Sequence, residues 1–142
     1  LGIKDVNNMG AAMAPAACDT ILQFFKDTNA KVSDYDAIFT GDLGKLGTEI
    51  LTDLAKDNNL DLSKNLYDCG AMLYKSKQQT FQGGSGAACS AIVFNSYILN
   101  KFKNKQYKKV LLTGTGALLS PLTSFQGESI PCIAHCLEIC IC

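Results

Sequence analysis

The 142-residue chain has no tryptophan and no arginine, and it carries one histidine. Its 13 basic residues are therefore all lysines, and they balance 13 acids to a formal net charge of zero. Nucleic-acid-binding proteins usually have a basic excess and use arginine for bidentate contacts. We therefore expect no nucleic-acid partner. The lysine run at residues 101–109 suits a solvated helix end, with a lipid or nucleic-acid patch as the alternative.

Long hydrophobic runs are also missing. None approaches the roughly 20 residues of a membrane-spanning helix, and no segment resembles a signal peptide, so we expect any membrane contact to be peripheral. With 47% hydrophobic residues, residues 1–142 can fill the core of one domain. The first residue is Leu1 rather than methionine, which favours a fragment of a longer chain.

Cysteine is plentiful, but the seven residues are an odd number in a chain with a good apolar core. This favours reduced thiols in a cytosolic compartment over a disulfide scaffold. Four of them, Cys132, Cys136, Cys140 and Cys142, form a terminal group. Such a group can bind zinc, but the even spacing also describes the small face of a strand, opposite a face of larger apolar residues. That small face would suit close packing by a helix.

Hydrophobic periodicity predicts helices and strands in alternation, and hence an α/β fold with a sheet covered by helices. Pro15 suits the first turn of a helix over residues 14–27. A second helix should carry the apolar stripe from Leu46 to Leu54. Strands are expected at 37–40, 109–113 and 133–142, with brief turns or strands at 65–68 and 72–74.

Residues 82–91 have almost no side-chain bulk and lead into the apolar Ile92, Val93 and Phe94. They predict a helix over about 86–103 that is apolar on nearly all sides and belongs in the centre of a protein. Its small-residue start allows either close packing or the binding of an anion by free amides. Cys89, near its first turn, is either a buried structural cysteine or a nucleophile, with His135 as the one available histidine base.

Three glycine-bearing loops, at residues 41–44, 83–86 and 114–116, should meet at one crevice, because loops at the carboxyl ends of strands converge there. None matches a phosphate-binding loop. Asp42 could hold a cation and Lys45 a carboxylate, whereas Ser85 is equally explained as a helix N-cap. The candidate ligand-binding residues are Asp42, Lys45, Gly84, Ser85, Gly86 and Gly114; no catalytic residue, metal ligand or cofactor is predicted.

Six segments taken in order resemble the stage V sporulation protein AD family, which belongs to the thiolase-like group. They are residues 1–5, 8–17, 40–44 (TGDLG), 83–86 (GGSG), 113–121 (TGTGALLSP) and 126–135 (QGESIPCIAH). The resemblance implies the C-terminal half of a thiolase-like fold, with a mixed sheet and the small-residue helix at the interface between layers. It also implies an N-terminal half elsewhere in the parent chain, and self-association of the isolated half.

Condensing members of the thiolase-like group use a cysteine from the N-terminal half and histidine or asparagine from C-terminal loops. Here the corresponding loops, at 41–44, 83–86 and 113–116, contain none of these groups. The resemblance therefore implies a chain that is not an enzyme. It implies a binding role for dipicolinic acid with calcium, in a multi-protein channel of the developing spore.

By the same resemblance, the protein should be cytoplasmic or in the forespore, peripheral to the spore inner membrane, and in contact with other channel proteins. Glycine amides at a helix N-terminus, with Lys45, would suit a flat dicarboxylate, and Asp42 would suit calcium. An acyl-transferring condensing enzyme is one alternative. A purely structural module of the channel complex is another.

Overall fold

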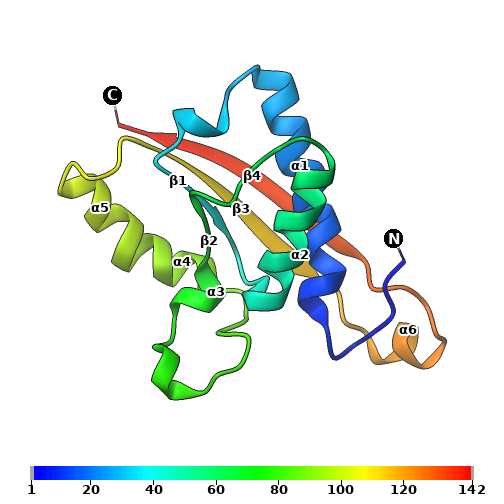
Figure 1. Ribbon diagram of the computed structural model, residues 1–142. Helices are drawn as coiled ribbons and strands as arrows, with labels where there is room; N and C mark the ends of the chain where they lie inside the picture. The colour runs from blue at the N-terminus through cyan, green and yellow to red at the C-terminus, as the bar shows by residue number, and fades with distance from the viewer. Residues whose placement is uncertain (1, 142) are drawn as a thin grey trace.

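The computed structural model describes residues 2–141, whose strands form a four-stranded sheet in the order β2-β1-β3-β4 (Figure 1). Strand β1 (Ala37–Thr40) is parallel to both β2 (Leu66–Asp68) and β3 (Lys109–Ala117). Strand β4 (Cys132–Cys140) is antiparallel to β3. This mixed sheet confirms the predicted α/β class. The thiolase-like assignment remains a prediction.

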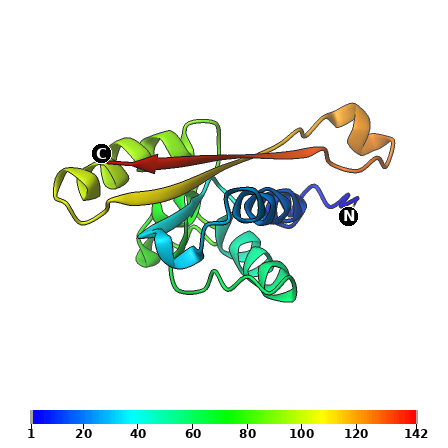
Figure 2. The ribbon, with the colours of Figure 1, turned by 90° about the horizontal axis from the view of Figure 1, so that it is seen from above.

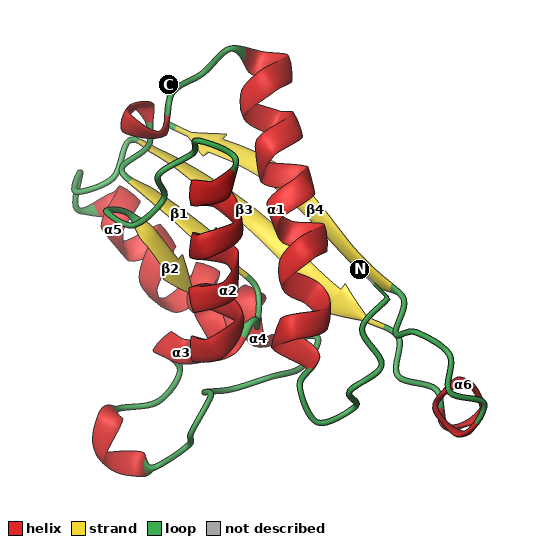
Figure 3. Cartoon of the chain, turned by 45° about the vertical axis from the view of Figure 1, so that its right-hand side comes forward, coloured by secondary structure: helices red, strands yellow, loops and turns green. Residues whose placement is uncertain are grey.

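Helices cover both faces of the sheet (Figure 2). Helices α1 (Met9–Thr28) and α2 (Gly44–Asp57) lie side by side over one face (Figure 3). On the other face lies a continuous helical segment made of α4 (Cys89–Val93), a π-helical turn (Phe94–Ile98) and α5 (Leu99–Lys103). Strand β1 faces both layers, because Ile38 packs with α1 whereas Phe39 packs with the α4–α5 segment. Shorter helices are α3 (Cys69–Met72) and α6 (Pro121–Phe125).

Helix α1 begins earlier than its sequence predicts. The Asn8 side chain accepts a hydrogen bond from the Ala11 amide at 3.1 Å and caps a helix that starts at Met9. Pro15 therefore lies inside the helix rather than in its first turn, and that prediction is wrong. The small residues from Gly10 to Ala12 hid the start of the helix, because they add little to the hydrophobic periodicity.

The segment 114–116 is part of strand β3, so the predicted turn there is wrong. Strand β3 continues to Ala117 because β4 pairs with it throughout, with Gly114 opposite His135 and Gly116 opposite Ile133. Pairing to a neighbouring strand overrides the low strand propensity of glycine. The chain reverses later, through α6, and the Leu118 amide closes the hairpin by donating to the Pro131 carbonyl.

Strand β4 has the two predicted faces. Cys132, Ala134 and Cys136 pack against the core that contains α1, which confirms that the small face is covered by a helix. On the opposite face, Ile133 and Leu137 are 55% and 60% exposed. Cys142 lies outside the described residues, and among residues 2–141 no group of three His, Cys, Asp or Glu side chains could hold a metal ion.

The α4–α5 segment starts at Cys89, three residues later than predicted, and one side of it is buried. Val93, Ile98 and Phe102 pack against the sheet. Ile92 is 51% exposed and Tyr97 is 37% exposed on the outer side. The expected burial on all sides is therefore not achieved within the described residues.

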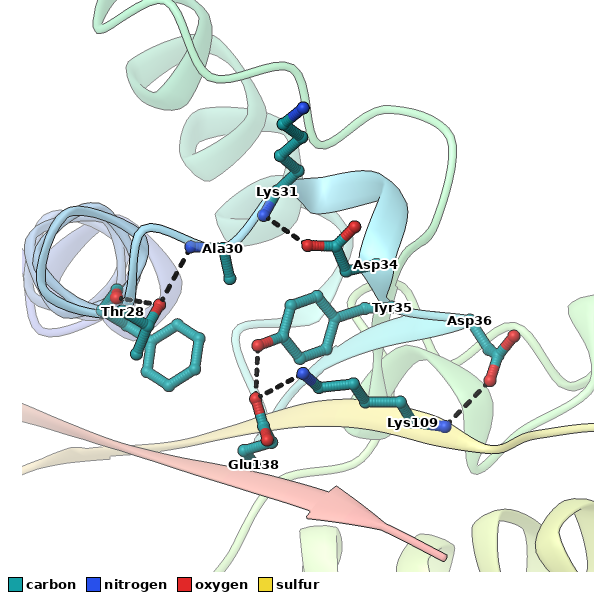
Figure 4. Close-up of polar contacts among 9 residues, drawn as sticks. Thr28, Ala30, Lys31, Asp34, Tyr35, Asp36, Lys109 and Glu138 are labelled. Carbon is teal, nitrogen blue, oxygen red and sulfur yellow. Dashed lines mark hydrogen bonds and ion pairs between the residues drawn. The ribbon is translucent and has the colours of Figure 1, made fainter.

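A polar cluster joins the start of β1 to β3 and β4 (Figure 4). The Tyr35 hydroxyl donates to Glu138 Oε2, and Lys109 Nζ lies 3.0 Å from the same oxygen. Asp36 Oδ2 accepts from the backbone amides of Lys108 and Lys109. The hydrogen bonds from Tyr35 and Lys109 lower the pKa of Glu138. The cluster holds strand β4 to the sheet at the end opposite the glycine loops.

Candidate functional site

The three predicted glycine segments meet at Asp42, which directly follows Gly41 at the end of β1. Asp42 Oδ2 accepts from the Ser85 hydroxyl and the Gly86 amide, each at 2.9 Å. The Thr115 hydroxyl donates to Asp42 Oδ1 at 3.2 Å and accepts from the Asp42 amide at 3.1 Å. The prediction that these segments converge is confirmed, with Thr115 as a link that the sequence did not single out.

A hollow of about 210 Å³ opens at this junction. Segments 41–42, 85–87, 89–90 and 115–117 line it, together with two methionines of helix α1, Met9 and Met13. Asp42 places a carboxylate in its wall. The hollow therefore suits a cation, a hydrogen-bond donor or a metal-linked anion better than a free anion.

Cys89 lines the same hollow as a buried thiol. Its Sγ lies 3.7 Å from the Gly41 carbonyl oxygen, and burial raises its pKa to about 11, with further contributions from Asp42 and Asp68. A cysteine nucleophile needs a lowered pKa and a base within hydrogen-bond reach. His135 lies on β4 opposite Gly114 and is not among the residues that line the hollow. The geometry favours the structural interpretation of Cys89.

In the tip at residues 83–86, Gly83 and Gly84 are tightly packed, whereas a Cβ atom on Gly86 would meet nothing within 4 Å. The amide of Gly84 donates to the Gly70 carbonyl at 2.8 Å, and the amide of Gly83 donates to the Thr80 carbonyl at 2.9 Å. A Cβ atom on Gly83, whose φ is 116°, would lie 2.4 Å from the Gly70 carbonyl oxygen. These amides and that of Gly86 already have protein acceptors, so they are not the free amides that the sequence suggested. Close packing explains Gly83 and Gly84, and a positive φ of 126° explains Gly86.

Asp68 is a key residue that sequence analysis missed. It is 3% exposed, and its Oδ2 accepts from the Thr40 hydroxyl and the Leu43 amide. Its Oδ1 accepts from the amides of Gly44 and Ala71. Burial raises the pKa of Asp68 against the effect of these four donors. The signal in the sequence was an aspartate just before Cys69-Gly70, a pattern typical of a helix N-cap.

The structure separates the six predicted ligand-binding residues. Asp42, Ser85 and Gly86 line the first hollow, and Gly84 lines a neighbouring one of about 220 Å³, which Asp42 and Ser85 also line. Lys45 lines a different hollow of about 470 Å³ with residues 74–76 and 79–81. Gly114 lines none of these hollows and lies in the β3–β4 ladder.

The arrangement is that of an α/β unit whose loops build small-molecule-sized hollows at the carboxyl ends of its parallel strands. The family model described as Stage V sporulation protein AD (SpoVAD) matches residues 1–140. A curated relative, Stage V sporulation protein AD of Bacillus subtilis (strain 168), is 48% identical over 135 residues. The chain therefore belongs to the stage V sporulation protein AD family.

That alignment covers 95% of this chain but 40% of the relative, so the chain corresponds to less than half of the relative's length. Within residues 2–141, no helix combines the length and the apolar character needed to cross a membrane.

Proposed function

We propose that this chain is the C-terminal half of a thiolase-like, non-catalytic sporulation protein that binds dipicolinate together with calcium in the spore channel machinery. The observation that carries the proposal is the hollow at Asp42, which the loops at 41–44 and 83–86 and the end of strand β3 build in a chain of a sporulation family. The resemblance to the stage V sporulation protein AD family suggests the ligand, and the hollow at Asp42 supports a binding site for it.

The charge of the hollow favours dipicolinate in its calcium-bound form. The Asp42 carboxylate would repel a free dicarboxylate dianion at close range. Calcium binds carboxylate oxygens in flexible geometry and readily takes ligands from two molecules. A calcium ion between Asp42 and dipicolinate would turn this repulsion into attraction.

An acyl-transferring condensing enzyme is the alternative function. It requires an activated nucleophile and proton-transfer groups beside the substrate. The raised pKa of Cys89 and the position of His135 on β4 give this chain neither. These two features support a binding role.

The uncovered side of the molecule supports a partner within the same protein. Ile92 and Tyr97 of the α4–α5 segment and Ile133 and Leu137 of β4 are large, apolar and exposed. We propose that the N-terminal half of the parent chain covers this side, and that the isolated half self-associates through it. Other channel proteins, at a position peripheral to the spore inner membrane, complete the proposed set of partners.

The test is calorimetric titration of dipicolinate into the full-length protein, with and without calcium. We expect dipicolinate to bind, and calcium to raise its affinity. In Asp42→Asn the calcium-dependent gain in affinity should fall by at least about tenfold. Asp53→Asn removes the same charge from the exposed surface of α2 and should change nothing. Absence of binding both with and without calcium would refute the proposed function. Equal dipicolinate affinity of wild type and Asp42→Asn in the presence of calcium would show that calcium does not bind in this hollow.

A further inference from the structure

The outer edge of strand β4 carries unpaired backbone groups. Strand β4 lies at one end of the strand order and, with nine residues, is the longer of the two edge strands. At the two ends of the β3–β4 ladder, the Leu118 amide donates to the Pro131 carbonyl and the Ile141 amide donates to the Lys108 carbonyl. Because backbone groups alternate between the two sides of a strand, the odd-numbered residues of β4 bond to β3 and the even-numbered residues face outward.

One of these outward groups is held by helix α1, since the Thr20 hydroxyl donates to the Ala134 carbonyl at 3.2 Å. Others are open. Within residues 2–141, the amides and carbonyls of Cys136 and Glu138 and the amide of Ala134 have no backbone or side-chain partner. An extended peptide can add to such an edge through main-chain hydrogen bonds.

A hollow of about 350 Å³ lies between this edge and α1. Two aspartates of α1, Asp19 and Asp27, line it with Ala134, His135 and Cys136 of β4, and no lysine is among the described residues that line it. Both aspartates are exposed, and neither takes part in an ion pair within the described part of the chain. The edge therefore offers negative charge beside its open backbone groups.

The spacing of the two aspartates suits an added strand. Eight residues of a helix span about 12 Å. Two residues four positions apart on a strand are separated by about 13 Å and point to the same face. Because α1 packs over β3 and β4 (Figure 3), two long basic side chains at such positions of an added strand would reach Asp19 and Asp27.

A second copy of this chain fits the edge poorly. Strand β4 contains no lysine or arginine, and it carries Glu138. Antiparallel pairing of two β4 edges would also bring the aspartates of both α1 helices toward one another, and like charges in proximity are unfavourable. Charge complementarity instead favours a basic, extended segment of a different protein.

We propose that the edge of β4 is a docking site for an extended segment of a partner protein that carries two lysine or arginine residues four positions apart. The segment adds a strand to the sheet through the outward backbone groups of Cys136 and Glu138, and its basic side chains contact Asp19 and Asp27. This site is separate from the Asp42 hollow and from the apolar side assigned to the N-terminal half of the parent chain.

The test is fluorescence anisotropy of labelled peptides titrated with the full-length protein. The probe is a peptide of threonine and valine, of the same length as β4, with two lysines four positions apart, and we expect it to bind. A peptide with glutamate in place of both lysines should not bind. A peptide with the lysines three positions apart, on opposite faces, should bind about two- to fivefold more weakly, because it loses one exposed ion pair.

Two further comparisons separate the roles of charge and backbone. Asp19→Asn and Asp27→Asn should each weaken binding of the probe about two- to fivefold, whereas Asp53→Asn on α2 should change nothing. A probe with all of its amides N-methylated keeps its charge but should lose at least about tenfold in affinity. No binding of the probe would overturn the proposal. Equal binding of the N-methylated peptide would overturn strand addition, and equal binding of the peptide with lysines three positions apart would overturn the role of the aspartates.

Hydrogen exchange of the backbone amides in the full-length protein locates the bound probe. The probe should slow exchange at Cys136 and Glu138, whose amides face outward, and leave exchange at Leu137 and Ile139 unchanged, because their amides face β3. Slow exchange at Cys136 and Glu138 before any peptide is added would show that the parent chain already covers this edge. That result would overturn the proposal.

Discussion

Removing the buried carboxylate of Asp68 should destabilise the protein more than removing any exposed acid. In Asp68→Ala the amides of Leu43, Gly44 and Ala71 lose their acceptor, whereas the Thr40 hydroxyl can turn to the Tyr67 carbonyl, already 3.3 Å away. An unsatisfied buried donor costs about 1–3 kcal/mol, so we expect a loss of at least about 3 kcal/mol. This is a large part of the about 5–15 kcal/mol that stabilises a typical domain.

Asp68→Asn provides an intermediate case. Each oxygen of Asp68 accepts two hydrogen bonds, so the amide nitrogen removes an acceptor from two donors in either orientation. We expect a loss of about 1–3 kcal/mol, because the amide should take the orientation in which Thr40 is one of the two donors, and Thr40 can turn to the Tyr67 carbonyl. Urea unfolding of the full-length protein measures both variants, with Asp53→Asn as the control. A loss below about 1 kcal/mol for Asp68→Ala would refute the reasoning.

Three further predictions concern other parts of the chain. The pKa of Glu138 is lowered in the folded protein, so its stabilising contribution is complete above about pH 4.3, the pKa in the unfolded chain, and is lost as pH falls through the folded pKa. The thermal unfolding curves of wild type and Glu138→Gln should therefore differ at pH 7 and converge in acid. A difference that stays constant with pH would contradict this. Gly83→Ala should lower the free energy of unfolding in urea by about 1–3 kcal/mol, because the new Cβ would clash with the Gly70 carbonyl and alanine would have to adopt the positive φ of Gly83. An unchanged unfolding midpoint would exclude that contact. The isolated chain should elute as an oligomer in gel filtration, and Ile92→Ser with Leu137→Ser should shift it toward monomer; a monomeric wild type would remove the proposed interface.

The sequence predicted those elements whose hydrophobic pattern is local. Strand β1 matches its prediction at residues 37–40, and the small face of β4 packs against the core of α1 as its alternation indicated. Helix starts were less predictable, because the start of α1 depends on the Asn8 cap within a run of small residues. The extension of β3 through Gly114 and Gly116 depends on pairing with β4, which cannot be predicted from the residues of β3 alone.

The candidate site was predicted in outline. Convergence on Asp42 followed from the topology of parallel strands, but the sequence did not reveal how the carboxylate would be used. The buried hydrogen-bonding role of Asp68 was not predicted, because its four donors come from three segments that are separate in the sequence. The separation of Lys45 from Asp42 likewise depends on the course of the loop between α3 and α4, a region with weak periodicity.

Equilibrium dialysis of dipicolinate against the full-length protein in the presence of calcium tests the central claim most directly. The account predicts an excess of unaltered dipicolinate on the protein side, which falls when Asp42 is replaced by asparagine. Equal dipicolinate concentrations on both sides of the membrane would contradict it.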